Sequence, residues 1–148
     1  MHLIHIKLEV VTIFSIEPRS STPIYEQIIS SVKESIIKGI LQPGDKLPSV
    51  RELAGSLTTN PNTVSKAYSE LERLKIIETL RGKGTFIAMN YKPKLEGDMM
   101  SKLKNELKQI LLDAHYMGVE KEAMKKLLDE IYTELRNDTS KGGNTHEK

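Results

Sequence analysis

Residues 43–74 read PGDKLPSVRELAGSLTTNPNTVSKAYSELERL, a pattern that predicts two helices joined by a short polar turn. The first helix begins at Ser49, where SVRE forms a capping box: the serine hydroxyl accepts from the Glu52 backbone, and the Glu52 side chain reaches back. The second helix begins at Pro61, which suits the first helical position, and Asn60 before it is a favourable cap. The proline therefore marks the start of a helix.

Apolar residues recur at helical spacing in both segments. In the first helix they are Leu53, Ala54 and Leu57. In the second helix, which runs to about Leu74, they are Val64, Ala67, Tyr68, Leu71 and Leu74. Each helix therefore has one side for a core, while most polar residues of TTNPNTVSK lie off that side.

A further helix is predicted upstream, in STPIYEQIISSVKESIIKGIL. Thr22 is the expected cap and Pro23 the expected first residue. Gly39 can adopt the left-handed turn that ends the helix. The apolar stripe consists of Ile24, Ile28, Val32 and Ile36.

Downstream the periodicity changes to that of β-structure. In IIETLRGKGTFIAM, two short β-rich runs flank a glycine turn, which predicts a hairpin. Three helices followed by a hairpin make a winged helix-turn-helix domain, which we place at residues 22–90. The predicted fold class is mainly α with a small β wing, and a short two-helix hairpin follows.

The C-terminal part is predicted to be a helical hairpin for dimerisation, over residues 99–137. A linker at 91–98 contains Pro93 and Gly97, and Gly118 separates the two helices. Residues 138–148 are polar and glycine-containing, as in disordered tails. The expected dimerisation residues are Leu103, Leu107, Ile110, Leu111, Ala114, Met124, Leu128, Ile131 and Leu135.

Composition excludes several classes of protein. Without cysteine the chain has no disulfide and no thiolate metal site, and no apolar run approaches the length of a membrane span. Residues 1–21 lack the features of a signal peptide; we expect a strand or an irregular extension there, and a cytoplasmic protein. No catalytic residue, metal site or cofactor is expected. The pair His2 and His5 lacks a third ligand, and GKGT lacks the spacing of a phosphate-binding loop.

The polar start of the helix at Pro61 is a candidate for DNA recognition. In a helix-turn-helix, the first turn of the second helix enters the major groove, where Asn, Thr and Ser address base edges or phosphates. The glycine hairpin carries Arg81 and Lys83 beside two glycines, which let the backbone approach a phosphate closely. The alternative is that Asn60 only caps and the other polar residues are solvated. The candidate DNA-binding residues are Ser49, Arg51, Thr59, Asn60, Asn62, Thr63, Ser65, Lys66, Arg81, Gly82, Lys83 and Gly84.

Residues 22–89 resemble the GntR family of bacterial winged-helix regulators, because they contain the motifs PGDKLPSVREL, TVSKAY and GKGTF in that order. The chain is similar to the YtrA-like subfamily in its PIYEQI and NPNTVSKAY segments and in its short helical tail. The resemblance implies double-stranded operator DNA as the partner, a dimerisation hairpin without a large effector pocket, and repression of the chain's own operon, often one encoding an ABC transporter. By position it also implies that Arg51 contacts DNA and that Gly82 is the wing glycine.

Three positions depart from the family pattern. Many members have arginine where this chain has Pro61 and a basic residue where it has Ser65, so their base preferences do not transfer to it. Lys75 replaces a glycine that usually ends the helix. If Lys75 is left-handed, the cost relative to glycine is about 1 kcal/mol.

Charge favours a homodimer that binds a palindromic operator. The net charge is +2, and Lys46 to Lys83 contains seven basic and four acidic residues. One copy would neutralise few phosphates, whereas two copies read two half-sites. A winged helix used for protein–protein contact is the rival hypothesis. The sequence identifies no effector; a small molecule acting through pivoting about the linker is a hypothesis that rests on Pro93 and Gly97.

Overall fold

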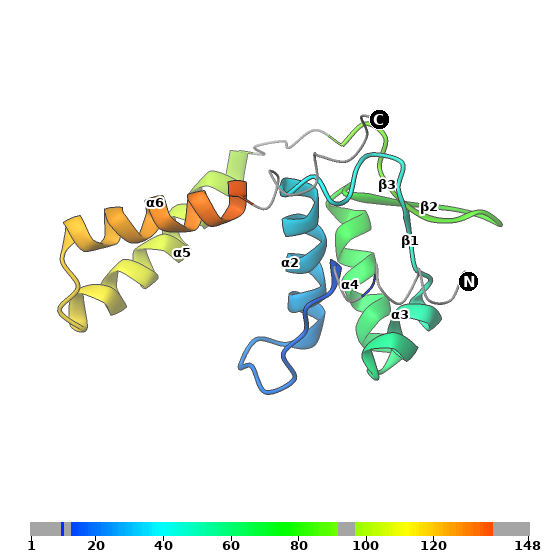
Figure 1. Cartoon of the computed structure of the whole chain (residues 1–148), viewed down its shortest axis with the longest axis horizontal. Helices are drawn as coiled ribbons and strands as arrows, with labels where there is room; N and C mark the ends of the chain where they lie inside the picture. The colour runs from blue at the N-terminus through cyan, green and yellow to red at the C-terminus, as the bar shows by residue number, and fades with distance from the viewer. Residues whose placement is uncertain (1–9, 11–12, 92–96, 138–148) are drawn as a thin grey trace, which may run out of the picture. The chain divides into compact units, whose positions relative to one another are not determined.

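The computed structural model describes residues 10, 13–91 and 97–137 (Figure 1). The chain divides into two units, Met1–Tyr91 and Lys92–Lys148. The first unit contains α2 (Ile24–Ile37), β1 (Lys46–Leu47), α3 (Val50–Leu57), α4 (Pro61–Arg73), β2 (Ile77–Leu80) and β3 (Gly84–Ile87). The second contains α5 (Gly97–Tyr116) and α6 (Lys121–Asn137). The predicted fold class, mainly α with a small β wing, is confirmed.

The core of the first unit forms around α4, which packs against α2, α3 and β2. The buried residues of α4 are the apolar positions expected from the sequence, except that Leu74 is only half-buried and caps the helix. The largest fully buried side chains are Ile28, Leu47, Leu53, Leu71, Ile87, Val32 and Val64. They come from α2, β1, α3, α4 and β3, so these elements share one core that fixes the position of α4.

The start of α2 differs from the prediction. Pro23 is the N-cap and Ile24 the first helical residue, and Thr22 makes no capping bond. The Gln27 side chain holds the preceding loop instead: its Oε1 accepts from Glu17 N–H at 2.8 Å, and its Nε2 donates to Thr22 O at 2.8 Å. The prediction that Thr22 caps α2 is therefore wrong, because the Gln27 side chain, one turn into the helix, makes the side-chain hydrogen bonds at this end.

The wing is part of a three-stranded antiparallel sheet in the order β1-β3-β2. The predicted hairpin forms β2 and β3, with Ile77 opposite Ile87 and Leu80 opposite Gly84. Strand β1, which the sequence did not predict, pairs with β3 through Lys46 opposite Phe86. β1 is two residues long, so it has no alternation of its own to detect.

The expectation of a strand or irregular extension before α2 is wrong at Val10 and Ile13, which are helical. Val10 and Phe14 are both buried in the core of the first unit, and Phe14 N–H donates to Val10 O at 2.8 Å. Residues 1–9 and 11–12 lie outside the described residues. The extension thus supplies two core side chains.

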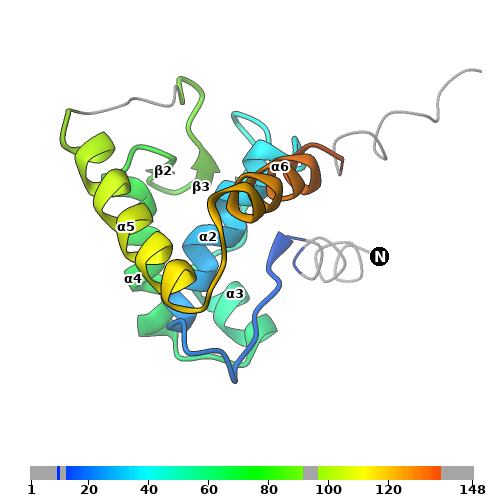
Figure 2. The same cartoon turned by 90° about the vertical axis from the view of Figure 1, so that its left-hand side faces the viewer.

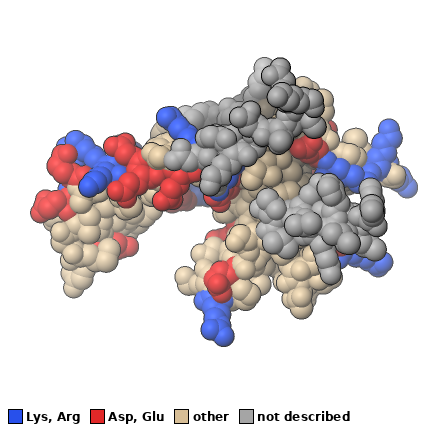
Figure 3. All heavy atoms as spheres, viewed as in Figure 1, with Lys and Arg blue, Asp and Glu red and all other residues tan. Residues whose placement is uncertain are grey.

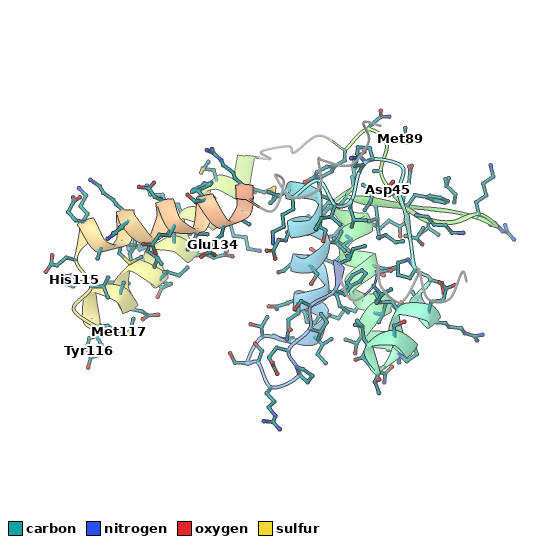
Figure 4. All side chains as sticks on the ribbon, in the orientation of Figure 1. Asp45, Met89, His115, Tyr116, Met117 and Glu134 are labelled. Atoms are coloured by element: carbon teal, nitrogen blue, oxygen red, sulfur yellow. The ribbon has the colours of Figure 1, made fainter. Side chains whose placement is uncertain are left out.

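The second unit consists of the two predicted helices (Figure 2). They are joined at Gly118, whose φ of 80° is left-handed, and Val119 N–H closes the turn on Ala114 O at 2.8 Å. In Figure 4, Tyr116 and Met117 project from this turn, and both are strongly exposed. Of the predicted linker, Gly97 and Asp98 belong to α5, while Pro93 lies outside the described residues, as do residues 138–148.

Candidate nucleic-acid interface

The turn between α3 and α4 is held by backbone hydrogen bonds at the end of α3. Thr58 ends the helix in a left-handed conformation with φ 50°, and Thr59 N–H donates to Ala54 O at 3.0 Å. A β-branched residue rarely adopts positive φ, because its Cβ substituents crowd the backbone. The rest of the fold must therefore offset the cost of this conformation.

The start of α4 is fixed by Asn60, as predicted. The Asn60 Oδ1 accepts from Asn62 N–H at 2.8 Å, and Pro61 occupies the first helical position. At the start of α3, Ser49 Oγ accepts from Glu52 N–H at 3.2 Å. Among the described residues, the reciprocal bond of the capping box, from Ser49 N–H to the Glu52 carboxylate, is absent. Both helices therefore begin at capped positions.

The polar side of α4 is accessible. Asn60, Asn62, Ser65 and Lys66 are exposed, and Thr59 and Thr63 are half-buried. The opposite side of α4 is anchored by Tyr68, whose hydroxyl donates to Pro48 O at 2.6 Å and whose burial raises its pKa. A helix anchored on one side and polar on the other has the geometry needed to enter a major groove.

Lys66 is not directed freely into solvent. Its Nζ lies 3.8 Å from the centre of the Tyr25 ring, in the first turn of α2. The Tyr25 hydroxyl donates to Glu26 Oε1 at 3.0 Å, and this hydrogen bond raises the Tyr25 pKa. Tyr25 was not among the predicted site residues. Its side chain meets Lys66 only because α2 packs against α4, and no local pattern indicates that contact.

The wing presents its basic residues at the tip of the β2–β3 hairpin. Arg81, Gly82 and Lys83 are exposed, and Lys and Arg atoms gather at this tip in Figure 3. Gly82 has φ 76°, so the tight turn requires a left-handed residue there. Gly84 has φ 125°, and a Cβ at this position would lie 2.8 Å from Cε of Lys46. The Lys46 side chain therefore reaches Gly84, next to the tip of the wing, and Lys46 is a basic position that sequence reasoning left out of the site.

The structure places all twelve predicted DNA-binding residues in the first unit, and none of them is buried. They lie at the start of α3, at the turn into α4 and on the wing. In Figure 1 the turn between α3 and α4 lies at one end of this unit, and the wing projects to one side. Arg51 is exposed in the first turn of α3. The arrangement combines a polar helix start with Arg51 of α3 and two basic residues of the wing, and these residue types can contact base edges and phosphates.

The predicted dimerisation residues are mostly exposed in the single chain. The exposed fraction is 57% for Leu103 and 56% for Ile110. Met124 and Leu135 are half-buried, and of residues 98–136 only Ala114 is buried. Other large apolar side chains of the unit are also exposed: Met99, Met100, Leu112, Leu127 and Tyr132. The two helices thus leave an extensive apolar surface uncovered.

The described part of the chain lacks a metal-binding cluster and a membrane-spanning helix. Within it, no three His, Cys, Asp or Glu residues are grouped as a metal ion requires. A search of the same residues finds no helix with the length and apolar character needed to cross a membrane.

Comparison with known proteins identifies close relatives. Residues 24–87 match the profile of the bacterial regulatory proteins of the gntR family. The HTH-type transcriptional repressor YtrA of Bacillus subtilis is 59% identical over 121 residues, which span 82% of this chain and 93% of the repressor. An uncharacterised HTH-type regulator of the same organism, YhcF, is 45% identical over 72% of this chain and 87% of its own length.

Solved structures agree with these sequence relatives. A transcriptional antiterminator from Listeria monocytogenes has a TM-score of 0.76 and 45% identity, covering 91% of this chain and 97% of the other. The GntR-family transcription factor YtrA from Sulfolobus acidocaldarius has a TM-score of 0.52 and 36% identity, covering 70% of this chain and 98% of its own. These similarities extend beyond the winged unit.

Proposed function

The chain belongs to the gntR family of bacterial regulatory proteins, and we propose that it is a homodimeric repressor that binds a palindromic operator. The family and these relatives are transcriptional regulators, not enzymes. The observation that carries the proposal is the exposed polar start of α4, capped by Asn60 and accompanied by Arg51 on α3 and a basic wing.

The proposed division of tasks follows from side-chain chemistry. Arg51, Arg81 and Lys83 contact phosphates, and the polar residues of α4 face base edges in the major groove. Phosphate contacts supply affinity for any duplex, whereas base contacts distinguish one sequence from another. Pro61 and Ser65 supply no positive charge, so base readout falls to the uncharged side chains of α4.

The proposed dimer forms through α5 and α6. Helices α5 and α6 bury only Ala114 between residues 98 and 136, so they have little core of their own. In Figure 3, charged atoms lie along one edge of this hairpin and uncharged atoms along another. A second copy is the occupant we propose for the apolar side. Symmetric pairing would then present two winged units to two half-sites.

The regulated genes are proposed from the family resemblance. We infer that the operator precedes the chain's own operon, that this operon encodes an ABC transporter, and that the protein acts in the cytoplasm. Sequencing the neighbouring genes tests the operon assignment directly. Neighbouring genes with no transporter would contradict it while leaving DNA binding intact.

A fluorescence-anisotropy titration tests DNA binding. The chain's own upstream DNA and a random duplex of equal length are titrated at several salt concentrations. We expect binding that weakens steeply as salt rises, because phosphate contacts release counterions, and a preference for the upstream DNA. Absence of binding at low salt would overturn the proposal. So would equally tight binding at high salt, and the rival role in protein–protein contact would then be favoured.

A further inference from the structure

The contact between Lys66 and Tyr25 joins the recognition helix to α2. Helices α2 and α4 pack against each other, and their N-terminal ends lie at the same end of the unit in Figures 1 and 2. Tyr25 is half-buried against the core, so its ring is held in place. The Lys66 ammonium lies 3.8 Å from the centre of this ring. A cation at this distance is attracted by the electrons of the ring face.

Some other lysines among the described residues pair with carboxylates instead. Lys38 pairs with Glu34 at 3.0 Å, and Lys125 pairs with Glu122 at 3.2 Å. A carboxylate partner offsets the positive charge that a phosphate would otherwise attract. Lys66 forms no ion pair within 4.0 Å with any other described residue. Lys66 is thus held by a partner that carries no charge.

Two carboxylates near Lys66 are engaged elsewhere. Glu70, one turn further along α4, is the position with which Lys66 would form a helical ion pair. The Glu70 carboxylate instead accepts from Arg73, at 2.9 Å from Nε and 2.6 Å from the terminal nitrogen. Glu26 accepts from the Tyr25 hydroxyl at 3.0 Å. The surroundings therefore order the lysine without a carboxylate within ion-pair distance.

We propose that Tyr25 is a positioning residue for DNA binding: its ring holds the Lys66 ammonium, still charged and already ordered, for a DNA phosphate. The inference rests on the proposed function. A free lysine must give up side-chain conformational entropy when it binds, and one that is already ordered gives up less. The ring thus improves affinity through Lys66, and the Tyr25 hydroxyl is not needed for this effect.

A double-mutant cycle tests the proposal. Tyr25→Leu removes the ring, Tyr25→Phe keeps it as the matched control, and each is combined with Lys66→Ala. Anisotropy with the upstream DNA should show binding weakened about threefold to tenfold by Tyr25→Leu and within twofold of wild type for Tyr25→Phe. In the Lys66→Ala background, Tyr25→Leu should have no further effect. Thermal unfolding of every variant identifies any loss of binding due to misfolding.

The salt dependence separates positioning from a direct phosphate contact. Lys66→Ala should lower the slope of log affinity against log salt by about one for each bound subunit, because a phosphate contact is lost. Tyr25→Leu should leave that slope unchanged, because the lysine still reaches its phosphate.

NMR spectra of the free protein test the contact without DNA. The ε-methylene protons of Lys66 should show a ring-current shift that disappears in Tyr25→Leu and persists in Tyr25→Phe.

Equal losses of DNA affinity from Tyr25→Leu in the wild-type and Lys66→Ala backgrounds would overturn the proposal. A loss of affinity in Tyr25→Phe equal to that in Tyr25→Leu would also overturn it. If wild type binds no DNA, the proposed function fails, and the ring-current shift still reports whether the contact exists.

Discussion

At the scale of single residues, Asn60 and Asn62 have different hydrogen-bonding capacity. The Asn60 Oδ1 accepts from Asn62 N–H at 2.8 Å, so the cap occupies this oxygen and leaves mainly the NH2 group for DNA. The Asn62 side chain is exposed, and no hydrogen bond among the described residues uses it. A carboxamide with both groups free can pair with adenine through two hydrogen bonds. Asn62 is therefore the better candidate for distinguishing bases.

Substitution of Asn62 should affect selectivity more than stability. We expect Asn62→Ala to reduce the preference for upstream over random DNA by about tenfold, because a bidentate contact contributes roughly 1–3 kcal/mol of discrimination. Competition anisotropy measures the ratio of the two affinities. Asn60→Ala is the control, and it should lower the free energy of unfolding by about 1 kcal/mol through loss of the cap. An unchanged preference in Asn62→Ala would show that other residues read the operator.

Lys75, at the position where the family usually has a helix-ending glycine, is left-handed with φ 57°. Lys75→Gly should therefore raise the free energy of unfolding by about 0.5–1 kcal/mol, since glycine adopts this conformation without a Cβ clash. Urea denaturation measures the change. Ser69→Gly, at an exposed position inside α4, is the matched control and should destabilise, because glycine disfavours a helix interior. A destabilised Lys75→Gly protein would mean that the lysine side chain contributes more than its backbone conformation costs.

At the scale of elements, the predictable parts are those with signals close together in the sequence. Asn60-Pro61, the apolar spacing of α4 and the RGKG turn each specify structure within a few residues, and α4 and the wing were predicted from them. Strand β1 pairs with β3 about forty residues away, and the Tyr25–Lys66 contact requires α2 to pack on α4. Such features depend on tertiary structure, which periodicity does not describe.

The wing should contribute affinity without sequence preference. Lys83→Ala removes a cation at the exposed tip, so operator and random DNA should both bind more weakly, by a similar factor. The slope of log affinity against log salt should fall by about one for each bound subunit. Anisotropy titrations between low and physiological salt measure both effects. Lys104 is an exposed lysine of α5 outside the winged unit, so Lys104→Ala should change neither the affinity nor the salt slope. A selective loss of operator binding in Lys83→Ala would instead indicate that the wing contacts bases.

At the scale of the whole molecule, charge and apolar surface favour the same assembly. The segment from Lys46 to Lys83 has seven basic and four acidic residues, and one of the basic residues, Arg73, is already paired with Glu70. So small a surplus gives a single winged unit few phosphate contacts and weak binding at physiological salt. The exposed stripe of α5 offers the means to join two such units. Operator affinity should therefore depend on residues that contact no DNA.

Ile110→Asp tests this dependence, because Ile110 is 56% exposed in the single chain and lies in the predicted dimerisation stripe. Burying an unpaired carboxylate in a dimer interface is strongly unfavourable, so sedimentation velocity should show a monomer. Operator affinity should fall at least tenfold, while the thermal unfolding of the winged unit should change little. Gln109→Asp introduces the same charge on the opposite side of α5 and should leave a dimer that binds normally. If Ile110→Asp stays dimeric, α5 is not the interface; if it is monomeric yet binds the operator fully, the two winged units bind independently.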